Sequence, residues 1–367
     1  MRWNPTKSAL SLTKLSTYKF KSNTDYNQEI IVTIANPPSS NARHLNKHKA
    51  FWNETAIAYT FLGYIGGIAL TSMANVGLNI LGVVLLTHSL IYSAYLSHEF
   101  MHGTIFKERR RNVIFGRLML WMNGGCYYGF HALTLQHIAH HVDRVDVFTF
   151  DIPAAIQKLP RLVRWIILGL EWCYFPAVAF WSRWQAIAKC WKDPKQAKSI
   201  TGIFALRSIA FILLGIISPK ALLLYFVAYL GMITVLRLMD AFQHTYEAFP
   251  VGTTLPKRDR DSEQLHTYSN LFSDRYLWLN LLVLNFGYHN AHHAVMKCPW
   301  HSIPELDREM AQNKTVNYIS LSDQLANYHR YRVTRLLTGQ GDATGEMGKK
   351  SYEQFYGAAD VSFITLY

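Results

Sequence analysis

The feature that most constrains this chain is a long stretch without charged side chains. From Thr55 to Ser97 the sequence contains no Asp, Glu, Lys or Arg. A helix that crosses a membrane needs about 20 apolar residues, so this stretch is long enough for two such helices. The turn between them is predicted at Thr71–Asn75, where small and polar residues cluster.

A second apolar stretch runs from Thr201 to Asp240, and Pro219-Lys220 interrupts it near its middle. Its other charged residues before Asp240 are Arg207 and Arg237, which lie near the two outer ends. The two stretches therefore predict an all-α membrane protein with four transmembrane helices, arranged as two hairpins.

The composition supports this fold class. Half of the residues are hydrophobic and only 17% are charged, whereas soluble domains carry about 25% charged residues. The chain is neither disordered nor typical of a soluble enzyme. The net charge of +13 does not predict nucleic-acid binding, because the apolar residues form long runs rather than leaving a polar, basic face. Anionic membrane lipids are the expected partner.

Lys and Arg are concentrated outside the two apolar stretches. The positive-inside rule then places both termini and the intervening polar segment in the cytoplasm of a multi-pass protein. The predicted segments are a cytoplasmic N-terminal segment (1–54), the first hairpin (55–97), a helical cytoplasmic cap (98–200), the second hairpin (201–240), and a further cap with the C-terminal tail (241–367). Within the cap, Arg161–Trp184 is apolar but carries four charges, which predicts a helix at the membrane interface. Leu277–Tyr288 has a similar character.

Nine of the 16 histidines occur in a pattern that is typical of metal ligands. Residues three or four apart share one helix face, so their imidazoles can converge. Neutral imidazole suits Fe, Zn, Cu and Ni, and this number of rings fits two ions better than one. The candidate ligands form box one (His98, His102), box two (His137, His140, His141), box three (His289, His292, His293), and His244 at the predicted exit of the fourth span.

The remaining candidates are isolated, and an isolated histidine is more often a surface or core residue than a ligand. This interpretation applies to His88, His131, His266, His301 and His329. His88 lies inside the second predicted span, where we expect it to form a hydrogen bond with a neighbouring helix.

Box one also fits H-E-x-x-H, the zinc protease motif, with Glu99 as general base. An intramembrane zinc protease is therefore an alternative of a different class. Such a site needs one further ligand, and this interpretation leaves both H-x-x-H-H boxes unexplained. A non-catalytic metal-binding membrane protein is a third class, although paired histidine boxes have little structural use.

From Thr55 to Asp307 the order of hairpins and boxes resembles the membrane fatty acid desaturase and hydroxylase superfamily. The resemblance implies two iron ions in a cytoplasmic helical cap, with all nine histidines as ligands. The chain departs from the acyl-CoA desaturases at two points. Asp240 stands where they usually have Asn, four residues before the exit histidine, and box one has three intervening residues where they have four.

The resemblance implies an enzyme that uses two Fe²⁺ ions, O₂ and external electrons to remove hydrogen from an unactivated C–H bond of a fatty acyl chain. Desaturation is the leading prediction. Oxidative decarboxylation of a free fatty acid to a terminal alkene is the runner-up, and fatty acyl or carotenoid hydroxylation or ketolation follows. The substrate is a fatty acid or an acyl group on a carrier.

Several acids lie close enough in sequence to the boxes to orient the imidazoles through their second ring nitrogens. An exposed charge or a salt-bridge partner is the competing interpretation for each. The candidates are Glu99, Asp143, Asp146, Asp151, Asp240 and Glu247. The basic cluster Lys107, Arg109, Arg110 and Arg111 fits a substrate carboxylate, carrier phosphates or anionic lipid heads.

The chain shows no obvious site for an electron-transfer cofactor. It has neither a C-x-x-C pair nor a G-x-G-x-x-G fingerprint after a predicted strand. A separate electron donor is therefore expected, such as a ferredoxin, a rubredoxin or a cytochrome with its reductase. A basic cytoplasmic surface would suit an acidic donor.

Overall fold

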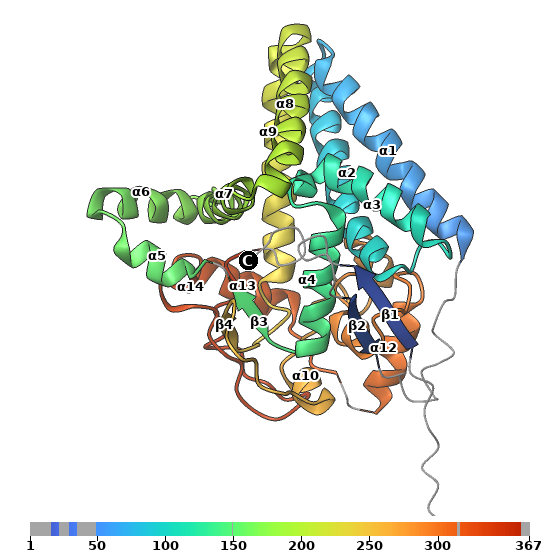
Figure 1. Cartoon of the computed structure of the whole chain (residues 1–367), viewed down its shortest axis with the longest axis vertical. Coiled ribbons are helices and arrows are strands. Elements are labelled where there is room, and N and C mark those ends of the chain that lie inside the picture. The colour runs from blue at the N-terminus through green and yellow to red at the C-terminus, as the bar shows by residue number, and fades with distance from the viewer. Residues whose placement is uncertain (1–15, 22–28, 35–48, 149, 314–315, 361–367) are drawn as a thin grey trace, which may run out of the picture.

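A computed structural model describes residues 16–21, 29–34, 49–148, 150–313 and 316–360 of the chain (Figure 1). Most of the predicted N-terminal cytoplasmic segment, residues 1–54, lies outside the described residues. Within it, strands β1 (Ser16–Lys21) and β2 (Glu29–Ile34) pair in antiparallel register. The remainder is mainly helical, as predicted.

Four helices are long and apolar enough to cross a membrane. They form two hairpins that stand together above the rest of the molecule in Figure 1. The prediction of four spans in two hairpins is confirmed, although the second hairpin begins earlier than Thr201. The four are α1 (Ala50–Ser72), α2 (Val76–His102), α8 (Pro194–Ile217) and α9 (Pro219–Asp240).

Polar side chains fix the short turns of both hairpins. Asn75 caps α2 by accepting a hydrogen bond from the backbone N–H of Leu78 at 3.0 Å. The Asn79 side-chain amide donates to the backbone carbonyls of Leu70, Thr71 and Met73. In the second hairpin, Ser218 caps α9. These bonds satisfy backbone groups that helix ends leave without partners, which matters most where water is scarce.

Glycines allow α1 and α2 to pack closely. A Cβ atom on Gly67 would lie 2.8 Å from the Cβ of Leu86. A Cβ atom on Gly82 would lie 2.8 Å from the backbone nitrogen of Thr71. Small residues of this kind bring helix backbones together where both helices are apolar. The position of α2 is important because its last turn carries box one.

The cap is made of two chain segments that meet below the hairpins. The first contains α3 (Arg109–Asn123), the 3₁₀ helix η2 (Gly125–Tyr127), α4 (Phe130–Asp143), β3 (Asp146–Phe148), α5 (Ile152–Lys158), α6 (Arg161–Trp172) and α7 (Ala177–Trp191). The second contains β4 (Ala248–Pro250), α10 (Arg260–Leu265), the 3₁₀ helix η3 (Leu277–Val283), α11 (His289–Ala294), α12 (Ile303–Gln312), α13 (Leu321–Arg330) and α14 (Thr334–Thr338). Strands β3 and β4 pair in parallel and join the two segments.

The prediction of one continuous helix over Arg161–Trp184 is wrong. The segment forms two helices, α6 and α7, which meet at a bend of 118°. Pro176 precedes α7, and proline lacks the N–H that a continuing helix requires. Figure 1 shows α6 running across the direction of α8 and α9. Leu277–Tyr288 likewise contains only the short helix η3.

A buried ion pair fixes this bend against the end of the fourth apolar helix. Both terminal nitrogens of Arg237 lie 3.0 Å from Glu171 Oε2. The other carboxylate oxygen of Glu171 accepts a hydrogen bond from the backbone N–H of Val178 at 2.7 Å. One carboxylate therefore joins α6, the start of α7 and α9. Because two N–H groups donate to one oxygen and the other oxygen is also satisfied, the cost of burying this charge is reduced.

Candidate metal centre

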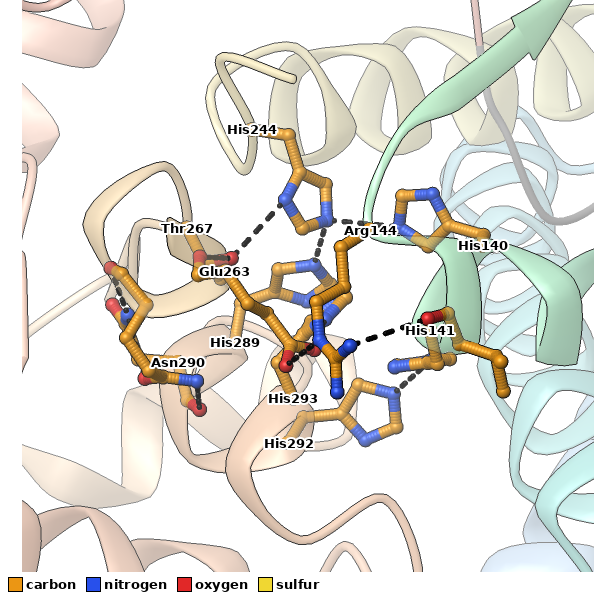
Figure 2. A network of polar contacts seen from close by, with 12 residues as sticks. His140, His141, Arg144, His244, Glu263, Thr267, His289, Asn290, His292 and His293 are labelled. Carbon is orange, nitrogen blue, oxygen red and sulfur yellow. Dashed lines mark hydrogen bonds and ion pairs between the residues drawn. The ribbon is translucent and has the colours of Figure 1, made fainter. Parts of the chain in front are cut away.

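The nine candidate histidines come together where the lower end of α2 meets the cap. They reach one region from four places: the end of α2, helix α4, the segment after α9 and the short helix α11. Figure 2 shows the rings of His140, His141, His244, His289, His292 and His293 gathered there. The convergence predicted from the spacing of the boxes is therefore present.

The first group of rings is fully buried and will be called the inner group. Its members have ligand nitrogens that all lie within 4.8 Å of one another: His98, His102, His137, His141 and His292. The Nε2 atoms of His102 and His137 are 2.7 Å apart. The Nε2 atom of His141 lies 3.2 Å from both His137 Nε2 and His292 Nε2. Three boxes thus contribute to one cluster.

The second group, called the outer group, contains His140, His244, His289 and His293. The Nε2 atom of His244 lies 3.1 Å from that of His140 and 2.8 Å from that of His289. Two members are held by carboxylates through Nδ1. His140 lies 3.1 Å from Asp146 Oδ1, and His293 lies 3.0 Å from Glu263 Oε1. These contacts leave Nε2 of both rings facing the centre.

Burial keeps most of these imidazoles neutral. It lowers the pKa of His137, His141, His244, His289 and His293, and neighbouring imidazoles lower these values further. The pKa of His292 falls to about 3 for the same reasons. For His140, burial alone would lower the pKa, but the hydrogen bond and charge of Asp146, with Asp240 and Glu263, raise it overall. Neutral imidazole is the form that binds metals.

The arrangement of ring nitrogens fits a bound metal. The Nδ1 atom of His293 faces Glu263, and its Nε2 atom is buried without a hydrogen-bond partner among the described residues. A neutral imidazole carries one proton, which the carboxylate holds on Nδ1, so Nε2 presents a bare lone pair. Buried polar atoms are normally satisfied, and a cation between the converging Nε2 atoms would satisfy this one. The inner and outer groups together provide donors for two ions.

The predicted acids Glu99 and Asp146 lie at the centre. Glu99 is buried, with Oε1 3.4 Å from His98 Nδ1. Its Oε2 accepts hydrogen bonds from the Thr104 hydroxyl at 2.7 Å and the backbone N–H of Trp300 at 3.2 Å. Both carboxylate oxygens are therefore engaged, and the contact of Oε2 with Trp300 joins the end of α2 to the second cap segment. Asp240 ends α9 and contributes to the raised pKa of His140.

The other predicted polar residues lie outside the two histidine groups. Glu247 is exposed and pairs with Arg258, and Asp151 caps α5. Asp143 is half-buried beside box two, and burial raises its pKa. The three arginines form the exposed first turn of α3, where Arg111 lies over the Phe106 ring. These residues, Arg109, Arg110 and Arg111, are not part of the histidine groups in the described part of the chain.

The structure adds residues that the sequence patterns did not indicate. Glu263 on α10 is buried and is shared between His293 and Arg144, whose Nε lies 2.9 Å from Oε2. The hydroxyl of Thr267 lies 3.4 Å from Nδ1 of His244. In the sequence, the one visible clue to these contacts is Asn290, a polar residue inside box three.

Asn290 joins α11 to α10 through a polar clamp. Its side-chain amide donates to Gln264 Oε1 at 3.2 Å, and its Oδ1 accepts from the backbone N–H of Asn317 at 3.3 Å. The Asn317 amide in turn donates to the backbone carbonyls of Gln264 and Thr267. The helix that carries box three is therefore fixed to the helix that carries Glu263.

Four of the five isolated histidines form hydrogen bonds with nearby hydroxyl groups and lie outside the two histidine groups. His88 bonds to Tyr59 of the neighbouring helix α1, with Nδ1 2.6 Å from the hydroxyl. His266 and His301 bond to nearby hydroxyls of Thr245 and Ser302, and His329 bonds to Tyr174.

A cavity of about 510 Å³ reaches the centre from the side. His137 and His140 line it on one side, and Ala186 and Cys190 of α7 line it on the other. Further apolar side chains come from the segment that joins α4 to β3 and from β3 itself. Lys189, Asp193 and Gln196 provide polar atoms at the junction of α7 and α8, and Asp143 and Asp146 also belong to the lining. The cavity lies within the range of about 300–1,000 Å³ that is typical of small-molecule sites.

The comparison with protein families agrees with this geometry. The family model described as fatty acid desaturase matches residues 75–321, a region that includes all nine candidate ligands. No curated protein matches the chain.

Proposed function

The chain belongs to the fatty acid desaturase family, and we propose that it is an integral membrane oxidase that introduces a C=C bond into a fatty acyl chain with two iron ions and O₂. The observation that carries this proposal is the junction of two histidine groups with an apolar-lined cavity. The histidine groups provide donors for the metal ions, and the cavity provides space for an acyl chain beside them.

Bound iron would supply O₂ activation and the removal of hydrogen from a C–H bond. The protein's own contribution is to hold the imidazoles and to exclude water. Glu263 and Asp146 fix the ring orientation of His293 and His140 through Nδ1. Burial of the inner group keeps its rings neutral and restricts access of solvent to the centre.

The cavity supports an acyl substrate. Small side chains, among them Ala139, Val145 and Ala186, leave room beside His137 and His140, where Asp146 is already engaged by the His140 ring. An acyl chain in this space would lie next to the ligands, and the carbon nearest to them would be the one that reacts. The polar end of the substrate would lie toward Lys189 and Gln196.

We further propose that the cap, the metal centre and both termini are cytoplasmic. The proposal follows from the Lys and Arg residues, which are concentrated in the cap and avoid the turns between the apolar helices, with Lys220 as the exception. Electrons would come from a separate protein, and a cytoplasmic, basic cap would suit an acidic donor.

The decisive experiment is mass spectrometry of products from purified protein supplied with Fe²⁺, O₂ and a reducing donor protein. Free and carrier-bound fatty acids of several lengths should give products of unchanged length with one added double bond. Products one carbon shorter would replace desaturation by decarboxylation, and an added oxygen would replace it by hydroxylation. Turnover without O₂ would overturn the oxidase itself. One bound zinc with peptide cleavage would favour the protease.

The role of the cavity has its own test. Ala186→Trp should fill the space beside box two and abolish turnover of long acyl chains, whereas Ala188→Trp on the exposed face of α7 should leave it intact. Because Ala186 is buried and its replacement can unfold α7, Cys190→Trp at a half-buried position provides a second variant. Equal turnover in Cys190→Trp and the Ala188 control would exclude the cavity as the acyl site.

A further inference from the structure

Two polar side chains of α2 reach out of the hairpin and hold η3. His88 Nε2 lies 3.1 Å from the backbone carbonyl oxygen of Leu282. One turn further along α2, the Tyr92 hydroxyl donates to the carbonyl of Leu281 at 2.5 Å. Two consecutive carbonyls of η3 are therefore bonded to one face of an apolar helix.

The partners of His88 determine its tautomer. A carbonyl can only accept, so Nε2 must carry the proton. The neutral ring then has a bare Nδ1, which accepts a hydrogen bond from the Tyr59 hydroxyl at 2.6 Å. His88 thus connects α1, α2 and η3, and each of its nitrogens has one defined role.

These bonds hold η3 beside the apolar part of α2. His88 stands ten residues before His98, about 15 Å along α2, inside the stretch that has no charged residue. The outward side of η3 is apolar, with Trp278 65% exposed and Leu277 and Leu282 also exposed. Backbone carbonyls at membrane depth need protein partners because lipid offers none, and His88 and Tyr92 meet that need.

The inward side of η3 leads directly to box three. Asn280 is buried and its amide donates to the Tyr288 hydroxyl at 3.2 Å, next to His289. Phe286 stacks on Tyr95 with ring centroids 4.5 Å apart, and its ring lies 5.0 Å from His98 and 5.5 Å from His289. A shift of η3 would therefore move a ring that is packed between box one and box three.

We propose that η3 is a lipid-contacting element and that His88 and Tyr92 are positioning residues which, through η3 and Phe286, set the placement of box three. This inference rests on the proposed function in one respect, since it takes box three to bind metal. Neither residue belongs to the two histidine groups or lines the cavity, so we expect their loss to alter the metal centre and kcat while leaving KM unchanged.

The test compares full-length variants in membranes or vesicles. His88→Leu removes both ring contacts, and Tyr92→Phe removes one hydroxyl without changing shape. Tyr64→Phe is the matched control, because its hydroxyl meets Tyr225 of α9 rather than η3. Hydrogen exchange across residues 281–288 should be about fivefold faster in Tyr92→Phe, and more in His88→Leu, since one net hydrogen bond contributes about 1 kcal/mol.

The absorption spectrum of Co²⁺ bound in the metal centre reports ligand geometry, which a general loss of protein stability would not change. It should change in His88→Leu and return toward wild type in His88→Gln, whose amide can still donate to Leu282 and accept from Tyr59. An unchanged spectrum and unchanged exchange in His88→Leu, in a protein that binds Co²⁺, would overturn the inference. Failure of the wild-type protein to bind Co²⁺ or Fe²⁺ would instead overturn the proposed function.

Contact with lipid is tested separately by cysteine labelling in vesicles. In a Cys173→Ser, Cys190→Ser background, Trp278→Cys should resist a water-soluble maleimide, whereas Asp274→Cys, four residues earlier and also exposed, should react. Detergent should expose both positions. Equal labelling of both in intact vesicles would place η3 in water and contradict its lipid contact.

Discussion

The inner and outer histidine groups face each other in one centre but are built differently. The inner group is fully buried, and its neighbouring carboxylates are Glu99, which is also held by Thr104 and Trp300, and Glu263, which lies near His141. The outer group is backed by Asp146 and Glu263, and two of its rings, His140 and His244, are only half-buried. The cavity reaches both groups, through His137 and His140.

This difference indicates how the two groups would hold their ions. A carboxylate on Nδ1 fixes the tautomer and makes the opposite nitrogen a stronger ligand. The inner group instead relies on burial and on many converging rings. We therefore expect the inner ion to depend on the number of histidines and the outer ion to depend on the acids behind them.

The largest effect should come from removing one ligand of each group. His292→Ala in the inner group and His140→Ala in the outer group should each lower the iron content, from about two ions toward one per chain. Turnover should fall by roughly a hundredfold or more in both, because the proposed chemistry uses both ions. Iron analysis and product assays test this directly. Two irons and full activity in both variants would refute the ligand assignment.

Removal of the buried acid should distinguish the groups. Glu263→Gln keeps the shape of the side chain but removes the charge that fixes His293. The affinity of the outer group for its ion should therefore fall about 10- to 100-fold. Metal titration measures this change. Glu247→Gln is the matched control, because Glu247 is exposed and pairs with Arg258 at the surface. Equal affinities in both variants would contradict a supporting role for Glu263.

The clamp on box three should have a smaller effect. Asn290→Ala breaks the link from α11 to Gln264 and Asn317, leaving their buried groups unsatisfied. We expect a loss of about 1–3 kcal/mol in the free energy of unfolding. Metal affinity of the outer group should fall less than in Glu263→Gln. Thermal unfolding with and without metal measures both changes, and Asn313→Ala on the exposed end of α12 is the control.

The sequence predicted that the histidines converge because their spacing is set by a single helix turn. Box one and box two lie within the continuous helices α2 and α4, so the shared face follows from the 3.6-residue period. The charge-free stretch predicted the first hairpin for a similarly local reason. Asp146 was found because it follows box two closely along the chain.

The residues that were missed depend on contacts between distant segments. Glu263 lies on α10, which meets box three only because Asn290, Gln264 and Asn317 join the two helices. No spacing rule links these positions. The bend between α6 and α7 is a different kind of error, since Pro176 was visible in the sequence. The apolar character of the segment favours a helix, but Pro176 ends any continuous one.

The smallest effect should come from Asp146, and its sign depends on pH. Asp146 raises the pKa of His140 against the effect of burial, so a proton competes with the metal for this ring as the pH falls. Asp146→Asn removes the charge, which weakens His140 as a ligand but also lowers its pKa. At pH 8 the variant should bind the outer ion about two- to threefold more weakly. At pH 6 this difference in affinity should disappear, because protonation of His140 weakens metal binding more in the wild type than in the variant.

Metal titrations at the two pH values measure this change, with Asp143→Asn as the control. An affinity difference that stays the same at both pH values would show that Asp146 acts only by orienting the ring. A difference that widens at low pH would contradict the effect of Asp146 on the pKa of His140, and the contrast between the two groups would then rest on Glu263 alone.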